Sequence, residues 1–329
     1  MAEVKVGRIV GWQKLSPILS IFRLTSEPGS RFPDYVPGQY IALRRENCKL
    51  TKKVAGSDGK PRYVPHLDES AGSTKLGPIT HSYSIASAPF ESLENGHLEF
   101  YVVLELDGQG TPGRLTGSLF ESDPPADDKL VYVNRITGTF TLGKRANGLT
   151  SVLLVGTGTG LAPFISMIKQ LHFNACHGST NGVQYTVLHT NRTYQELAYH
   201  EELIAIEAAQ RFDFTYVASV SRPTARDFDD PRMGRGRANN LLRHMFEMPL
   251  KEEEEVQALL AKGGDASRAK AALEKTVKPA LPKHISLPDL RKRLDPQRTA
   301  ILTCGNPPGM EDTKYVADTH HIHFEKEDW

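Results

Sequence analysis

The chain has 329 residues, of which 24% are charged and 39% hydrophobic, and its formal net charge is +1. A chain of this length can bury two cores, and its even charge balance gives no reason to expect nucleic acid as a partner. Because the first residues, MAEVKVGRIVGW, include no apolar signal region and no apolar run reaches membrane-spanning length, we expect a cytoplasmic protein without membrane insertion.

The three cysteines, Cys48, Cys176 and Cys304, are far apart and form no C-x-x-C pair. This spacing argues against a disulfide framework, a zinc ribbon or an iron–sulfur cluster, and it suits a reducing compartment.

The N-terminal half is predicted to be β-structure. Residues 3–43 alternate between apolar and polar and turn frequently, and the strand-like runs HSYSIASAP, HLEFYVVLEL and KLVYVNRITGTFTL follow. Short strands separated by turn signals favour an antiparallel β-barrel or sandwich, and we assign this domain to residues 1–146.

A long polar segment interrupts this half at residues 44–80 and exceeds the usual length of a loop. Its first part, residues 44–63, has seven basic and two acidic residues, so seven minus two leaves a local charge of +5. The basic residues are Arg44, Arg45, Lys49, Lys52, Lys53, Lys60 and Arg62, against Glu46 and Asp58.

From Leu149 onward the pattern changes to α/β. The strand-like runs SVLLVG, VQYTVLHT, FDFTYVASVS and TAILTCG alternate with helical segments. This alternation predicts βαβ units, so we expect a doubly wound parallel sheet over residues 147–329. Residues 249–288 are an insertion in this domain, which we expect to be a solvated pair of helices.

The segment VLLVGTGTGLAPF, residues 152–164, predicts a phosphate-binding turn. An apolar strand leads into Gly156, Gly158 and Gly160, where a backbone without Cβ can approach a ligand, and Pro163 lies near the start of a helix. The spacing differs from G-x-G-x-x-G, and no lysine follows the glycines, which argues against an ATPase-type loop. The late position implies that another domain precedes the nucleotide domain.

Five motifs occur in one order: HSYS at 81–84, GRLT at 113–116, GTGTGLAPF, CGNPPGM at 304–310 and the C-terminal FEKEDW. In this order they resemble the ferredoxin–NADP(+) reductase family of bacterial type. The resemblance implies FAD on the β-barrel, NADP(H) on the α/β domain and hydride transfer between them. It also implies that the flavin exchanges single electrons with ferredoxin or flavodoxin.

The resemblance implies a set of FAD-binding residues. In this sequence they are His81, Ser82, Tyr83, Ser84, Tyr101, Arg114, Leu115, Thr116 and Trp329. Tyr83 would pack on the flavin, Ser84 would lie near the hydride-accepting atom, and Trp329, in a tail at 318–329 that reaches the flavin, would stack on the cofactor. The family has arginine where this chain has His81, and an imidazole offers fewer donors to a pyrophosphate.

For NADP(H), the resemblance implies contacts from three groups of residues. These are Gly156, Thr157, Gly158, Thr159, Gly160 and Pro163 of the turn; Asn191, Arg192, Ser221, Arg222, Arg235 and Arg237 after later strands; and Gly305 and Asn306. Arginine is suited to a 2′-phosphate, so we predict NADPH over NADH. Cys304 would lie near the nicotinamide and position it, which with Tyr83 and Ser84 completes the catalytic set.

Several alternatives stay open. The acceptor could instead be an oxygenase component, a quinone or free flavin, or the chain could be a non-catalytic NADP(H)-sensing module. An acidic carrier would find opposite charge on residues 44–62, which would speed its association. No metal site is predicted, because His320, His321 and His323 lack the carboxylate or cysteine spacing that would complete one. The sequence does not predict the oligomeric state.

Overall fold

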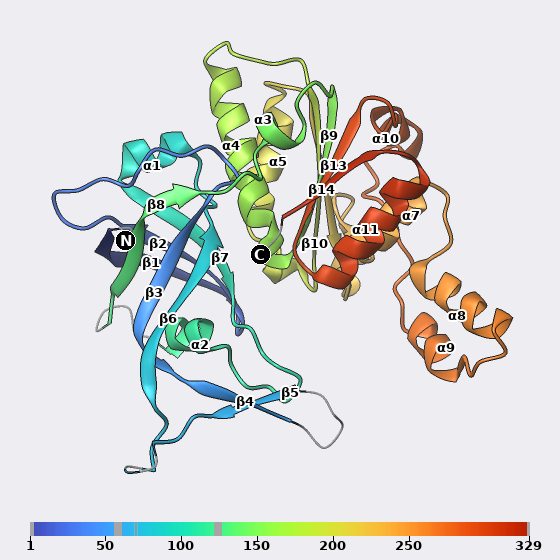
Figure 1. The fold of residues 1–329 in the computed structure, drawn as a ribbon. Coiled ribbons are helices and arrows are strands. Elements are labelled where there is room, and N and C mark those ends of the chain that lie inside the picture. The colour runs from blue at the N-terminus through green and yellow to red at the C-terminus, as the bar shows by residue number, and fades with distance from the viewer. Residues whose placement is uncertain (1–2, 56–60, 69, 71, 122–126, 328–329) are drawn as a thin grey trace. The chain divides into compact units, whose positions relative to one another are not determined.

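The computed structural model describes residues 3–55, 61–68, 70, 72–121 and 127–327 (Figure 1). The chain divides into two compact units, Met1–Gly138 and Thr139–Trp329. The boundary predicted after residue 146 lies within the second unit, before its first strand.

The first unit is built on a six-stranded antiparallel sheet with the order β6-β3-β8-β1-β2-β7. Its strands are β1 (Val4–Ser16), β2 (Leu19–Thr25), β3 (Tyr40–Lys49), β6 (Leu76–Ser84), β7 (His97–Val103) and β8 (Lys129–Thr137). One face buries an aromatic-rich core that includes Phe22, Phe100 and Tyr132. Tyr83 on edge strand β6 meets Phe100 on the opposite edge strand β7, with ring centroids 6.5 Å apart. The sheet therefore curls into a half-barrel, which confirms the predicted antiparallel fold.

Two helices and a hairpin complete this unit. Helix α1 (Pro89–Asn95) ends at Gly96, whose φ of +68° suits glycine, and α2 (Arg114–Glu121) packs against β3 and β6. Strand β3 continues to Lys49 and β6 begins at Leu76, so the additional segment between them is 50–75. It contains a separate two-stranded sheet of β4 (Thr51–Ala55) and β5 (Pro61–Pro65).

The second unit has a six-stranded parallel sheet with the order β12-β11-β10-β9-β13-β14. Its strands are β9 (Ser151–Thr157), β10 (Gln184–Asn191), β11 (Phe214–Val220), β12 (Gly234–Arg235), β13 (Thr299–Cys304) and β14 (His323–Lys326). β9 and β13 are buried at nearly every position, as expected for strands covered on both faces.

Helices cover both faces of this sheet, with α4 and α5 on one side and α7, α10 and α11 on the other (Figure 1). The helices of the unit are α3 (Leu142–Arg145), α4 (Ala162–Cys176), α5 (His200–Ala209), α6 (Ala225–Asp229), α7 (Ala238–Met245), α8 (Lys251–Ala261), α9 (Ser267–Glu274), α10 (Leu287–Arg293) and α11 (Pro307–Thr319). The predicted doubly wound sheet is confirmed. Helices α8 and α9 lie in the predicted insertion and pack against each other.

The strand order places a topological switch point between β9 and β13. From β9 the chain proceeds through β10, β11 and β12 in one direction, and it then returns to add β13 on the other side of β9. In open α/β sheets the connections diverge at such a point, which leaves a crevice beyond the carboxyl ends of the two strands. The loops after Thr157 and Cys304 both leave the sheet at this edge.

Candidate functional site

The glycine-rich loop lies at the switch point. Its three glycines are required for different structural reasons: two by close packing and one by its backbone conformation. A Cβ on Gly156 would lie 3.1 Å from the Cα of Leu161, and one on Gly160 would lie 2.6 Å from the backbone nitrogen of Gly305. Gly158 has open space around it but adopts φ +57°, a conformation that favours glycine. Gly156 and Gly160 thus allow close packing within the unit, while Gly158 leaves room at the loop surface.

The loop after β13 is joined to the glycine-rich loop. The backbone N–H of Asn306 donates to the hydroxyl of Thr157 at 2.9 Å, and the Asn306 side chain accepts from the N–H of Gly309 at the start of α11. Gly305 adopts φ +131°, and a Cβ there would collide with Thr157. The structure therefore brings together Thr157, Gly160, Gly305 and Asn306, which the sequence placed in one site. Thr159 lies in the short 3-10 helix 158–161, and Pro163 in the first turn of α4.

A buried thiol–carboxyl pair lies at the end of β13. The thiol of Cys304 donates to Oε2 of Glu327 at 3.1 Å, and both side chains are buried. Burial, reinforced by the negative charge of Glu327, raises the pKa of the Cys304 thiol well above its ordinary value. Cys304 is therefore held as a neutral thiol, which is a weaker nucleophile than a thiolate.

Glu327 was missed by sequence reasoning, which considered only the aromatic end of the tail. β14 pairs in parallel with β13, and the N–H of Glu327 then donates to the carbonyl of Thr303 at 3.0 Å. This pairing places Glu327 next to Cys304. Trp329 lies outside the described residues.

At the end of β10, Arg192 is held by a buried acid. Its guanidinium binds both carboxylate oxygens of Glu196, through Nε at 2.7 Å and through Nη2, while Asn191 donates to the carbonyl of Glu196 at 2.6 Å. Glu196 is 4% exposed. Sequence reasoning predicted the arginine but not this partner, although the acid is only four residues away.

The other predicted arginines lie at the same edge of the sheet. The N–H groups of Ser221 and Arg222 donate to the carbonyls of Asn191 and Arg192, which extends the β10–β11 pairing into the loops. The Arg222 residue is exposed, and its side chain takes part in none of the ion pairs found in the described chain.

Two further arginines follow β11. The Arg235 guanidinium lies over the ring of Phe228, 4.5 Å from its centroid. Arg237 precedes α7 and approaches Oε1 of Glu252 at 3.3 Å, with 68% of its side chain exposed. Four arginines therefore lie at or just after the carboxyl ends of β10, β11 and β12.

In the first unit, the residues of the HSYS motif lie on edge strand β6. His81 and Ser82 are exposed, Tyr83 is half-buried and Ser84 is buried. Burial, with a smaller contribution from Glu105, raises the pKa of the Tyr83 phenol far above its ordinary value, so the ring stays neutral. Tyr83 also reaches β7 through Phe100, the neighbour of buried Tyr101.

The GRLT motif forms the start of α2. Arg114 is exposed, whereas Leu115 and Thr116 are buried, and the Thr116 hydroxyl lies 3.5 Å from the carbonyl of Gly113. Because α2 packs against β3 and β6, the first unit itself brings the GRLT and HSYS motifs together.

The basic segment has less free charge than its sequence suggests. Arg45 is buried and paired with Asp127, Arg44 is paired with Glu46 at 2.9 Å, and Lys49 with Glu121 at 2.9 Å. Lys60 lies outside the described residues. Lys52 and Lys53 on β4 remain exposed.

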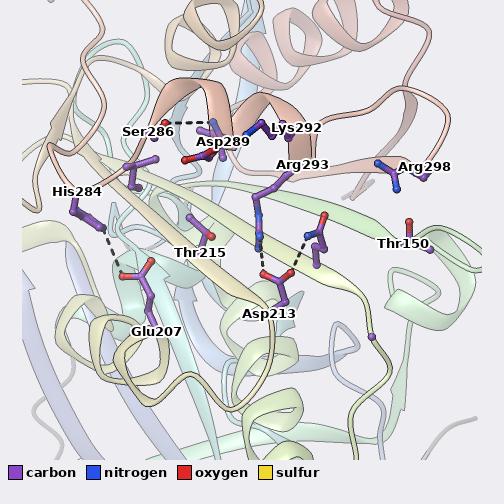
Figure 2. A pocket seen from close by; sticks show the side chains of 14 residues that line it. Thr150, Glu207, Asp213, Thr215, His284, Ser286, Asp289, Lys292, Arg293 and Arg298 are labelled. Carbon is purple, nitrogen blue, oxygen red and sulfur yellow. Dashed lines mark hydrogen bonds and ion pairs between the residues drawn. The ribbon is translucent and has the colours of Figure 1, made fainter.

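A cavity of about 820 Å³ opens at the other edge of the parallel sheet (Figure 2). It lies at the amino ends of β10 and β11. Three pairs of its lining side chains approach one another: Arg293 and Asp213 at 2.6 Å, Lys292 and Asp289 at 2.9 Å, and His284 and Glu207 at 3.7 Å. Ligands of such sheets bind at the carboxyl ends. This cavity is therefore separate from the candidate nucleotide site.

The C-terminal histidines have structural contacts. His320 stacks on Phe246 with centroids 4.3 Å apart, and His323 Nε2 lies 3.0 Å from the carbonyl of Arg145. Across the residues that the structure describes, no three His, Cys, Asp or Glu side chains are grouped to hold a metal ion. Nor does any helix in the described chain combine the length and apolarity needed to cross a membrane.

Comparison with known proteins agrees with this arrangement. Residues 154–261 match the family model of the oxidoreductase NAD-binding domain. A ferredoxin–NADP reductase A from Sorangium cellulosum is 28% identical over 236 residues, which cover 72% of this chain and 65% of that protein. The match thus spans a little less than two thirds of the relative's length.

Solved structures share the fold. A ferredoxin NADP+ reductase from Neisseria gonorrhoeae with bound FAD and NADP has a TM-score of 0.58 at 18% identity, covering 99% of both chains. The cytochrome P450 reductase GcoB from Amycolatopsis has a TM-score of 0.55 at 15% identity, covering all of this chain and 71% of the other. With the ordered motifs, these findings show that the chain is similar in sequence to a ferredoxin–NADP reductase and shares the two-domain fold of such reductases.

Proposed function

We propose that this protein is an FAD-dependent oxidoreductase that transfers hydride between NADP(H) and flavin. The observation that carries the proposal is the carboxyl edge of the parallel sheet. There the glycine-rich loop, the Cys304–Glu327 pair and four arginines follow strands of one switch-point sheet. FAD and NADP(H), when bound, supply the redox chemistry, and the protein supplies binding and orientation.

The second unit fits NADP(H). Gly158 leaves the loop surface open, and exposed Arg222 forms no ion pair within the described residues. Arg192 keeps its Nη1 donors, because Glu196 accepts from Nε and Nη2. Both oxygens of Glu196 are engaged by Arg192, so this acid does not offer a carboxylate to ribose hydroxyls as an NAD-binding acid would. These features favour NADPH over NADH.

Residues at the switch point would orient the nicotinamide. Gly160, Gly305 and Asn306 form the joined loops, and the neutral Cys304 thiol would contact the ring without forming a bond to it. Glu327 would fix the thiol's direction as its hydrogen-bond acceptor.

The first unit fits FAD through two adjacent motifs. The proposed contacts are His81, Ser82, Tyr83, Ser84, Tyr101, Arg114, Leu115, Thr116 and Trp329. Exposed Arg114 stands at the start of α2, where free N–H groups favour phosphate. His81 replaces a family arginine, so we propose that Arg114 carries more of the pyrophosphate binding.

For the acceptor we propose an acidic single-electron carrier, ferredoxin or flavodoxin. The relative's name supports this choice, and exposed Lys52 and Lys53 on the β4–β5 hairpin provide a small basic surface. The second candidate is a reductase for an oxygenase, which the shared fold of GcoB favours.

The test is NADPH oxidation with ferredoxin, flavodoxin, a quinone and free flavin as separate acceptors. We expect the carriers to be reduced fastest, with a rate that falls at high salt and in the Lys52→Glu, Lys53→Glu variant. If free flavin or a quinone is reduced faster than the carriers, that acceptor replaces ferredoxin or flavodoxin in the proposal. If the protein binds NADPH without oxidising it, the result favours a non-catalytic NADP(H)-sensing module.

A further inference from the structure

The helical insertion contacts one of the proposed nucleotide-binding arginines. Glu252 in the first turn of α8 approaches Arg237 at 3.3 Å, and its side chain is only 8% exposed. Arg237 itself is largely exposed. The insertion therefore brings a nearly buried negative charge to an arginine that is otherwise open to ligands.

The position of Glu252 is fixed by α7. Buried Asn240 donates through Nδ2 to Oε2 of Glu252 at 2.8 Å and accepts from the N–H of Lys251 at 3.1 Å. Two residues further along α8, Glu254 pairs with buried Arg243 at 2.9 Å. Three contacts thus attach the first turn of α8 to α7, so Glu252 cannot swing away as a free surface glutamate could.

We propose that Glu252 tunes the affinity of this site for the 2′-phosphate of NADPH, a role that rests on the proposed function. A phosphate dianion that binds Arg237 must either displace Glu252 from the guanidinium or bind beside a second negative charge. NADH has no phosphate at that position, so the carboxylate affects it little. The insertion is in this way part of the specificity apparatus: it weakens NADPH binding and leaves NADH binding nearly unchanged.

The ion pair is exposed on the arginine side, which limits the size of the effect. Pairs of this kind contribute about 0.2–1 kcal/mol, which corresponds to a change in affinity of about 1.4- to fivefold. Salt screening should reduce the effect further at high ionic strength.

The test uses the full-length FAD-loaded protein with Glu252→Gln, whose amide can still accept from Asn240, and Glu255→Gln as the control on an exposed position of the same helix. We expect Glu252→Gln to lower the KM for NADPH and the Kd for adenosine 2′,5′-bisphosphate by about two- to fivefold at low salt. The KM for NADH and the kcat should change little, and Glu255→Gln should match the wild type.

Three results would overturn the proposal: an unchanged KM for NADPH, an equal change for NADPH and NADH, or weaker binding of the bisphosphate. If Glu252→Gln is poorly folded, Glu252→Asp decides, because it keeps the buried charge but draws it back from Arg237 by one methylene; the KM for NADPH should then fall while the KM for NADH does not, and an unchanged KM for NADPH would overturn the proposal. Failure of the wild type to bind the bisphosphate or oxidise NADPH would instead reject the proposed function.

Discussion

At the scale of single residues, Gly160 ties the glycine-rich loop to β13. An alanine there would place its Cβ 2.6 Å from the backbone nitrogen of Gly305, and closer still to the carbonyl of Cys304, so backbone must shift. We expect Gly160→Ala to destabilise the second unit by about 1–3 kcal/mol in urea denaturation. Gly143→Ala is the control, because nothing lies within 4 Å of that Cβ. Equal stability of the two variants would contradict the close packing.

The cysteines differ enough to be separated by reactivity. Cys176 is exposed, whereas Cys48 and Cys304 are buried and burial raises the pKa of both thiols. We expect native protein at pH 8 to label one thiol rapidly with iodoacetamide, and the denatured protein to label all three. Peptide mapping should identify Cys176, and Cys176→Ala should abolish the rapid phase. Equally rapid labelling of Cys304 would contradict its pairing with Glu327.

Sequence reasoning found the arginines and the cysteine of the candidate site but not their acidic partners. Glu196 is four residues from Arg192, a spacing that indicates contact within an α-helix, yet here it follows a strand and lies in a short 3-10 helix. Glu327 reaches Cys304 only because β14 adds to β13, and Glu252 reaches Arg237 only because α8 packs on α7. Such contacts depend on tertiary packing, which local pattern does not specify.

At the scale of elements, a buried ion pair joins α7 to α11. Arg243 donates to both oxygens of Asp312, at 2.7 and 2.9 Å, and both side chains are nearly inaccessible. Removing the carboxylate leaves buried Arg243 with only the partly exposed Glu254 as an ionic partner, so we expect Asp312→Asn to cost up to about 3–5 kcal/mol in urea denaturation. Asp318→Asn on the same helix is the control, since the exposed pair with Lys314 should contribute at most about 1 kcal/mol. A similar loss in both variants would contradict the account.

The elements themselves were largely predictable. The β-branched runs became strands, and Pro163 and Pro307 lie in first helical turns, because their chemistry acts locally. The charge of the basic segment was less predictable. Arg45 and Lys49 count as free charge in the sequence, but Asp127 and Glu121, which are distant in the chain, pair with them.

At the scale of the whole molecule, a buried histidine links stability to pH. His189 is inaccessible, and its Nδ1 lies 3.2 Å from the hydroxyl of Tyr216. Burial, with a smaller effect from His200, lowers its pKa to about 3. Between about pH 6.5 and 3 the unfolded chain binds a proton that the folded chain cannot, so stability falls as pH falls.

We expect the unfolding free energy to decrease below pH 6.5 by up to about 1.4 kcal/mol per pH unit from this residue alone. Urea denaturation at pH 7.5, 6 and 5 measures how steeply the unfolding free energy changes with pH. His189→Gln should make this slope smaller, whether the variant is more or less stable than the wild type. An identical slope in the variant would show that His189 is not the group responsible.

The order of the two units was also predictable, because a phosphate-binding turn that begins only at residue 156 requires a preceding domain. The proposed role of the second unit is to deliver reducing equivalents from NADPH to a flavin. Its most direct test is anaerobic mixing of purified FAD-loaded protein with NADPH or NADH in a stopped-flow spectrometer. We expect NADPH to bleach the flavin absorbance at least about tenfold faster than NADH at equal concentration. A protein that binds no FAD, or one that both nucleotides bleach equally fast, would contradict it.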